Sequence, residues 1–371
     1  GVETGYSDQG LAFSEETLNI KKPNPDGFSL VYLVRLIMEE CSTLDQLPEY
    51  FNRYPVVGAY GTVWSDQKSG RGLVAELTPT AWEIIKMDGS LLWNFNHLDS
   101  DNLIAQQTAG VNLSPDPDRE TLAITYPQKD LFEVRDAIEF LGLQVGPQGD
   151  DYSHCGTRNP ICNKGATQMM VFHPDGDGVY LGMGVYYAAR QNIYHYHDDF
   201  SKAPELFKGA VPMKPVVVET ARIENLLLNN EGYRDAFIDL TKKYRDDANI
   251  HFLVALYSFR SKSLEQHAHF AQMAFTLNPE VAEYRLFAGI AAYFMGSFSE
   301  ALGLLEQIAP ADLYDRNEII RLFVLSKSWQ PVDKEKAEGY RAELNALLEQ
   351  HDGKDYFESA YLPFLELGAD E

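Results

Sequence analysis

The stretch of sequence that decides the fold is YPVVGAYGTVWSDQKSGRGLVAELTPTAWEIIKMDGSLLWNFNHL, residues 54–98. Apolar and polar residues alternate there between short turn signals, a pattern typical of antiparallel strands that follow one another along the chain. Turns are predicted at Asp66–Gly72 and Asp88–Gly89, and strands at Leu73–Leu77, Trp82–Ile85 and Leu91–His97. The last strand ends in Asn96 and His97, where a buried side-chain amide could stabilise an oxyanion. The stretch therefore predicts a meander with chemistry at one rim.

Length and charge limit the possible partners. A chain of 371 residues is too long for one ordinary core, so two domains are expected. The net charge of -24 argues against nucleic acid and anionic membranes as partners, because both draw affinity from clustered Lys and Arg. No window reaches about eighteen uninterrupted apolar residues, so no membrane span is predicted. Residues Gly1–Thr4 lack the charged and apolar regions of a signal peptide.

The composition changes near Val216–Glu219, which divides the chain into predicted domains of residues 1–216 and 217–371. The first domain is rich in Gly, Pro and β-branched or aromatic residues, with strand-like runs at 165–172, 178–185 and 193–197. The second has apolar residues at steps of three and four, which predicts an all-helical domain.

Two segments of the helical domain resemble each other at the period of a tetratricopeptide helical hairpin. The clearer one contains Gly289 and closes at Pro310, and the other contains Ala271 and closes at Pro279. Small residues allow paired helices to approach closely, and Pro ends the second helix. Residues 245–312 therefore predict either tetratricopeptide-like repeats or generic helical stacking, with a surface that could bind a protein partner.

Three cysteines cannot all pair within one chain. Cys155 and Cys162 flank a loop rich in Gly, Asn and Pro, and they are either two reduced thiols or, in an exported protein, a disulfide. Cys41 ends an apolar helical run that contains Leu33 and Ile37. We expect Cys41 to be a buried packing thiol and not a nucleophile.

Several short segments of the first domain carry a resemblance to a known family. They are, in chain order, Gly5–Ala12, Arg35–Thr43, Ala75–Pro79, Asn94–His97, Asn159–Cys162 and Lys164–Thr167. In this order and spacing they resemble the isopenicillin N acyltransferase family over residues 1 to about 200.

The resemblance implies an α+β protein whose first domain has the N-terminal-nucleophile (Ntn) hydrolase fold, a four-layer αββα arrangement of two stacked antiparallel sheets between helices. In such enzymes a precursor cuts itself before a Cys, whose freed α-amine serves as the base for its own thiol. The thiolate attacks an amide or thioester carbonyl, and hydrogen-bond donors stabilise the charge on oxygen. Asn96 matches the family's oxyanion donor, with His97 as a substrate-site neighbour. The implied substrate is a small-molecule amide or acyl compound, and no cofactor is implied.

The nucleophile itself is not found at its place in the family pattern. It lies well upstream of the segment that begins here at Gly5, Gly1 has no side chain for attack, and the three cysteines stand elsewhere. We therefore expect the first part of the fold and its Cys nucleophile to lie upstream of residue 1, in a lost segment or on a separately processed chain. The alternative is a catalytically dead scaffold that binds a partner or ligand through its helical repeats.

The substrate-orienting positions also depart from the family. Ser7 stands where an Asn is usual, and Asn163 stands where an Arg is frequent. Lys164 or Arg158 could supply the missing positive charge, or each is a solvated loop cation. Thr167, on the strand that follows, is expected to line the pocket, although a Thr in a half-buried strand needs no function.

Two polar clusters raise the question of a metal. Pro174–Gly178 has the form of a common hairpin turn and lacks the later acidic ligand of an EF-hand. Further on, strand alternation places His195 and His197 on one face, close enough to share an ion with Asp198 and Asp199 nearby, but no third ligand of the right kind is visible. No metal site is therefore predicted, and a metal-dependent enzyme is the third function class after an acyl-transfer enzyme and a scaffold.

Overall fold

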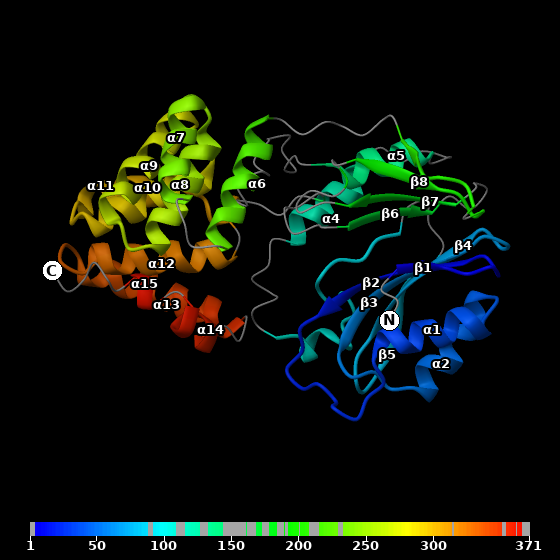
Figure 1. Ribbon diagram of the computed structural model, residues 1–371. Helices are drawn as coiled ribbons and strands as arrows, with labels where there is room; N and C mark the ends of the chain where they lie inside the picture. Colours follow the sequence, from blue (N-terminus) through cyan, green and yellow to red (C-terminus); the bar gives the residue numbers. More distant parts are fainter. Residues whose placement is uncertain are drawn as a thin grey trace. The chain divides into compact units, whose positions relative to one another are not determined.

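Two compact units make up the protein in the computed structural model (Figure 1). The structure describes residues 4–87, 92–108, 116–126, 133–143, 161, 168–172, 178–183, 189, 192–199, 201–207, 215–228, 233–313, 315–350, 354–360 and 362–365. The first unit holds strands β1–β9 with helices α1, α2, α4 and α5, and the second holds α6–α15. The predicted α+β class is confirmed, because antiparallel sheets come first and packed helices follow.

The first sheet is antiparallel throughout, in the order β1-β2-β3-β4-β5. Its strands are β1 (Thr4–Tyr6), β2 (Leu11–Leu18), β3 (Ala59–Asp66), β4 (Arg71–Leu77) and β5 (Trp82–Met87). The turn between β3 and β4 is closed by the Asp66 carboxylate, which accepts hydrogen bonds from Lys68 N at 3.0 Å and Ser69 Oγ at 2.7 Å. Gly70 then adopts a φ of 66°, which few other residues tolerate. The turn and the two strands predicted after it are confirmed.

Two helices, α1 (Leu30–Glu40) and α2 (Leu47–Arg53), cover one face of this sheet (Figure 1). Apolar residues at helical spacing on α1 and alternate residues on the strands share one core, which includes Leu33, Val34, Ile37, Leu11, Phe13 and Trp64. Cys41 lies in the same core at 1% exposure. Burial raises the pKa of its thiol, so Cys41 is a packing residue and a poor nucleophile, as expected.

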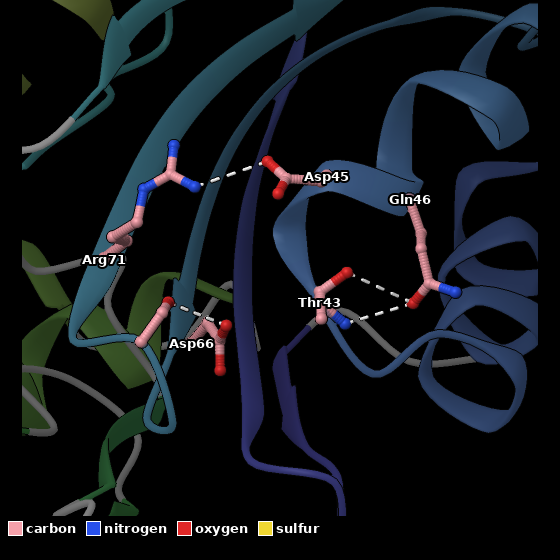
Figure 2. A network of polar contacts seen from close by, with 6 residues as sticks. Thr43, Asp45, Gln46, Asp66 and Arg71 are labelled. Carbon is pink, nitrogen blue, oxygen red and sulfur yellow. Dashed lines mark hydrogen bonds and ion pairs between the residues drawn. The ribbon is translucent and has the colours of Figure 1, made fainter.

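The short 3-10 turn η1 (Leu44–Gln46) joins α1 to α2 and is tied to the sheet (Figure 2). Gln46 Oε1 accepts the backbone N–H of Thr43 at 3.1 Å, which closes a capping box. Asp45 Oδ1 lies 3.3 Å from Arg71 Nη1 at the start of β4. Both of these side chains are exposed to solvent, so this ion pair contributes less than about 1 kcal/mol.

A second antiparallel sheet has the order β6-β7-β8-β9, with strands β6 (Gln168–Phe172), β7 (Val179–Met183), β8 (Ile193–Tyr196) and β9 (Glu205–Leu206). Helix α5 (Val134–Leu141) packs on β6, and Met169, Val171 and Ile193 are buried. The same unit contains α4 (Asp116–Thr125). Tyr6 of β1 stacks on Phe172 of β6, with ring centroids 5.9 Å apart, so the two sheets meet at this point.

The strand predicted at Leu91–His97 is wrong for the residues that the structure describes. Residues 92–97 pair with no strand and instead run across the face of the first sheet. A Cβ atom at Gly61 of β3 would lie 1.7 Å from Asn94 Oδ1, and one at Gly72 of β4 would lie 2.7 Å from Leu92 Cδ1. The two glycines thus leave room for the crossing segment, and alternation alone does not distinguish such an extended segment from a paired strand.

The second unit consists of packed helices. They are α6 (Pro215–Leu228), α7 (Tyr233–Lys243), α8 (Ala248–Arg260), α9 (Leu264–Leu277), α10 (Ala282–Phe294), α11 (Phe298–Leu305), α12 (Asp315–Trp329), α13 (Lys334–Gln350), α14 (Lys354–Ala360) and α15 (Leu362–Leu365). Helices α8 and α9 pack as one pair and α10 and α11 as the next. Gly289 lets the second pair approach closely, since a Cβ there would lie 2.5 Å from Leu305 Cδ2. None of the described helices is long and apolar enough to cross a membrane.

Candidate active site

Buried polar side chains fix the loop that follows the crossing segment. Glu76 of β4 is fully buried, and its carboxylate accepts the backbone N–H groups of Asp99 at 2.5 Å and Ser100 at 3.0 Å. Burial raises the pKa of Glu76, and these two hydrogen bonds oppose the shift. Gln107 Oε1 accepts the N–H of Leu98 at 2.5 Å. The loop therefore has little freedom, because each of these backbone donors is bound to a buried acceptor.

Asn96, at the end of the crossing segment, connects β2 with α4. Its Nδ2 donates a hydrogen bond to Glu16 Oε2 at 2.8 Å and lies 3.4 Å from the carbonyl oxygen of Thr17. Its Oδ1 accepts a hydrogen bond of 2.9 Å from Nη2 of Arg119. A guanidinium has only donors and an ionised carboxylate only acceptors, so these partners decide which end of the amide carries the NH2 group.

Arg119 is buried, with 6% of its surface exposed. Its guanidinium carbon lies 5.1 Å from the ring centroid of Phe95, in a cation–π contact. Burial lowers the pKa of Arg119, and the negative charge of Glu16 opposes that shift. A buried cation is costly unless it has partners, and Asn96, Phe95 and Glu16 supply them. Arg119, Asn96 and Glu16 thus form one polar chain inside the first unit.

A cavity of about 670 Å³ lies beside this chain and is lined by all three of its side chains. Other lining residues come from both sheets and include Ser14, Val63, Ser65, Met170 and Phe172. Ser14, Val63 and Ser65 alternate along β2 and β3 with Phe13 and Trp64 of the helix-covered core. The cavity therefore opens on the face of the first sheet that α1 and α2 leave free.

Residues 1–120 match the model of the family described as acyl-coenzyme A:6-aminopenicillanic acid acyl-transferase. These residues are a domain of this family. The match includes β1–β5, the crossing segment with Asn96 and His97, and Arg119 at its end. The family implies an Ntn-type fold and an acyl substrate, as the sequence resemblance indicated. The helical region has no family assignment, and no curated protein matches the chain.

Within the acyl-transferase domain, His97 lies among acidic residues. Its Nε2 is 2.8 Å from Asp99 Oδ1. Burial would raise the pKa of Asp99, but the hydrogen bond and charge of His97 outweigh it and hold that pKa below its ordinary value. His97, Asp99 and Glu120 of α4 each place one ligand atom within 4.8 Å of the others. In the part of the chain that the structure describes, no other group of three such side chains is close enough to hold a metal.

The histidines of the second sheet are adjacent, as strand alternation predicted. The ring centroids of His195 and His197 lie 4.3 Å apart. His197 Nε2 lies 3.7 Å from Glu205 Oε1, a contact too long for a hydrogen bond. Among the described residues no third metal-ligating side chain lies close enough to this pair to complete a metal site, so we do not include the two histidines in the candidate site.

Other predicted site residues lie outside the described residues. These are Arg158, Lys164 and Thr167, together with Cys155 and Cys162. The predicted turn at Asp88–Gly89 and residues 174–177 of the predicted turn at Pro174–Gly178 also lie there.

Sequence reasoning missed two residues of the acyl-transferase domain, Glu16 and Arg119. A signal for Glu16 was present, since it alternates with Phe13 and its neighbours on β2 and so falls on the free face of the sheet. No local signal identifies Arg119, because its contact with Asn96 joins residues 23 apart that meet only in the folded chain.

Proposed function

We propose that this protein is an Ntn-type acyltransferase or amide hydrolase in which Asn96 donates a hydrogen bond to the oxyanion. The observation that carries the proposal is the polar chain of Arg119, Asn96 and Glu16 on the wall of the cavity. Membership of residues 1–120 in the acyl-transferase family supports an acyl substrate.

The geometry of Asn96 suits this role. One amide hydrogen serves the 2.8 Å bond to Glu16, whereas the contact with the Thr17 carbonyl is long at 3.4 Å. We propose that a substrate oxygen that gains charge replaces the Thr17 carbonyl as the acceptor of the second hydrogen, while the amide keeps its orientation. Arg119, by donating to Oδ1, polarises the amide and makes its N–H groups stronger donors.

In the proposed reaction a Cys thiolate forms a bond to the carbonyl carbon of an amide or thioester, and the oxygen takes up the negative charge that Asn96 stabilises. Collapse of this intermediate expels the amine, which takes a proton, or the thiol. Water or a second amine then attacks the thioester and releases the Cys. We propose that this Cys lies upstream of residue 1, at the freed N-terminus of a processed chain, as the family resemblance implies. Burial of Cys41 disfavours the thiolate of that residue.

The cavity suggests how the substrate is oriented. Its wall carries the polar groups of Asn96, Arg119 and Glu16, which are bonded to one another, and apolar side chains such as Val63 and Phe172. We propose that the scissile bond lies at the polar part and the acyl group against the apolar part, because apolar surface gains from such burial.

The remaining assignments are proposals of the same kind. The first domain, residues 1–216, would form the four-layer αββα arrangement, with Thr167, Lys164 and Arg158 near the substrate and His97 beside the oxyanion donor. The helical domain, residues 217–371, would bind a protein partner through tetratricopeptide-like hairpins, which the pairing of α8 with α9 and of α10 with α11 supports.

The experiment that tests the function uses the product of the complete coding sequence, processed or not. It is assayed against a panel of linear N-acyl anilides and acyl thioesters, and its intact mass is recorded during turnover. An acylated N-terminal Cys peptide and release of the amine or thiol support the proposal. A complete protein that has no Cys, Ser or Thr at a processed N-terminus and turns over no member of the panel would favour the scaffold.

A further inference from the structure

We propose that His97, Asp99 and Glu120 form a binding site for a divalent transition-metal ion, of which zinc is the best match. His97 ends the crossing segment, Asp99 lies in the loop that follows it, and Glu120 belongs to helix α4. One ligand atom of each lies within 4.8 Å of the other two. Zinc bonds of about 2.1 Å hold tetrahedral ligands about 3.4 Å apart, so small rotations of these side chains would complete the site.

The donor set selects the kind of ion. One imidazole nitrogen and two carboxylates are ligands that zinc and its neighbours prefer, whereas calcium and magnesium favour oxygen ligands alone. The side chains of His97 and Asp99 are 21% and 28% exposed, so an ion can enter and keep a water molecule as its fourth ligand. A cation also relieves the repulsion between the carboxylates of Asp99 and Glu120.

The surrounding structure holds the ligands in place before an ion arrives. The backbone of Asp99 is fixed by the buried carboxylate of Glu76, at 2.5 Å, and the backbone of Leu98 by Gln107. Helix α4 is held against the same region by the hydrogen bond from Arg119 to Asn96. Preorganisation of this kind lowers the cost of binding, because less freedom is lost.

The consequence of binding would be a second link between the loop and α4. Glu120 follows Arg119 directly in the helix, and His97 follows Asn96 directly in the loop. An ion bound to His97, Asp99 and Glu120 would therefore keep Arg119 close to Asn96 and so maintain the hydrogen bond between them. This effect on the oxyanion donor rests on the proposed function, but binding of the ion does not.

The test is a calorimetric titration of the chelator-treated full chain with zinc chloride. It is run in a background of Cys155→Ser and Cys162→Ser, because thiolates also bind zinc. We expect about one ion per chain with a Kd in the micromolar range or below, and a melting temperature that rises with zinc. Glu120→Gln and Asp99→Asn, which keep the shape of each side chain, should each weaken binding by about tenfold or more and abolish the rise in melting temperature.

Two matched variants serve as controls. Asp101→Asn neutralises an exposed acid close to Asp99, and His195→Gln removes a histidine of the second sheet. Both should leave the zinc affinity within about twofold of the parent value. The proposal is overturned if no saturable binding is found, if Glu120→Gln binds zinc as the parent does, or if His195→Gln abolishes binding. None of these readouts needs catalytic activity, so failure here leaves the proposed function untouched.

Discussion

The guanidinium of Arg119 donates a hydrogen bond of 2.9 Å to the side-chain oxygen of Asn96, and the nitrogen of the same amide donates one of 2.8 Å to Glu16. The amide is thereby held in one orientation between a buried cation and a carboxylate. An oxyanion donor needs such fixation, since preorganised dipoles do not have to reorient during the reaction.

Arg119→Gln tests whether this contact positions the donor. Gln cannot supply the charge of the guanidinium, so Asn96 gains freedom to turn. We expect kcat to fall by about tenfold with KM little changed, and the free energy of unfolding to fall by about 1 to 3 kcal/mol. Steady-state kinetics and urea unfolding measure the two effects separately. If the variant is less stable but keeps the kcat of the parent enzyme, Arg119 has a structural role and does not position the donor.

Gly61→Ala tests the path of the crossing segment. The new methyl group would lie 1.7 Å from Asn94 Oδ1, so the side chain of Asn94 or the segment that carries it must move. We expect a loss of about 1 to 3 kcal/mol in the free energy of unfolding. Gly72→Ala also places a methyl group against this segment, 2.7 Å from the end of the Leu92 side chain, and should cost less because that side chain can rotate away. If Gly61→Ala unfolds in urea at the same concentration as the parent chain, the path described is contradicted.

Glu76→Gln tests how the loop is anchored. A carboxylate accepts both the Asp99 and the Ser100 N–H groups, whereas an amide offers one oxygen and turns an NH2 group toward the other donor. We expect the free energy of unfolding to fall by about 1 to 3 kcal/mol. Glu83→Gln, on the neighbouring strand, should cost less, because Glu83 accepts its hydrogen bonds from the side chains of Ser100 and Asn102 and holds no backbone donor among the described residues. Thermal unfolding of both variants at neutral pH measures the two losses. A smaller loss of stability for Glu76→Gln than for Glu83→Gln would contradict the proposed anchoring role of Glu76.

The burial of His267 leads us to expect that the helical unit loses stability in acid. It is fully buried in α9, its Nδ1 lies 3.0 Å from the carbonyl oxygen of Ala255, and burial lowers its pKa to about 4. The pKa of His267 in the folded state is below the ordinary value of 6.5. The contribution of the neutral side chain to the free energy of unfolding is therefore complete above pH 6.5 and is lost as the pH falls through about 4. The full effect is on the order of 3 kcal/mol.

His267→Gln should therefore remove much of the fall in unfolding free energy between pH 6.5 and 4, as measured by urea unfolding at a series of pH values. His269→Gln is the control, because His269 is exposed on the same helix. If His267→Gln keeps the full pH dependence of the parent chain, another group is responsible for the acid sensitivity.

The parts of the fold that local sequence determines were predicted correctly. Alternation at Leu73–Leu77 and helical spacing up to Cys41 reflect which faces are buried, and both are found. Alternation misled at Leu91–His97, because the segment places the side chains of Leu92 and Asn94 against Gly72 and Gly61 without pairing as a strand.

The candidate site was predictable only in part. Asn96 was predicted as a site residue because its neighbours in sequence carry the family pattern. The family match over residues 1–120 confirms the resemblance, and the role of Asn96 stays a prediction. Its partners could not, since Arg119 and Glu16 reach it from distant parts of the chain. The same holds for Glu120, which only the packing of α4 brings to His97.

The central claim is that Asn96 is the oxyanion donor, and the most direct test is kcat of Asn96→Ala in the complete, processed enzyme. We expect kcat per folded molecule to fall by about a hundredfold or more. Stability should fall as well, because Arg119 loses a partner, so the folded fraction is measured by circular dichroism in the same samples. Asn102→Ala, which removes an exposed amide of the following loop, should keep the parent kcat. If folded Asn96→Ala turns over at the rate of the parent enzyme, the account is contradicted.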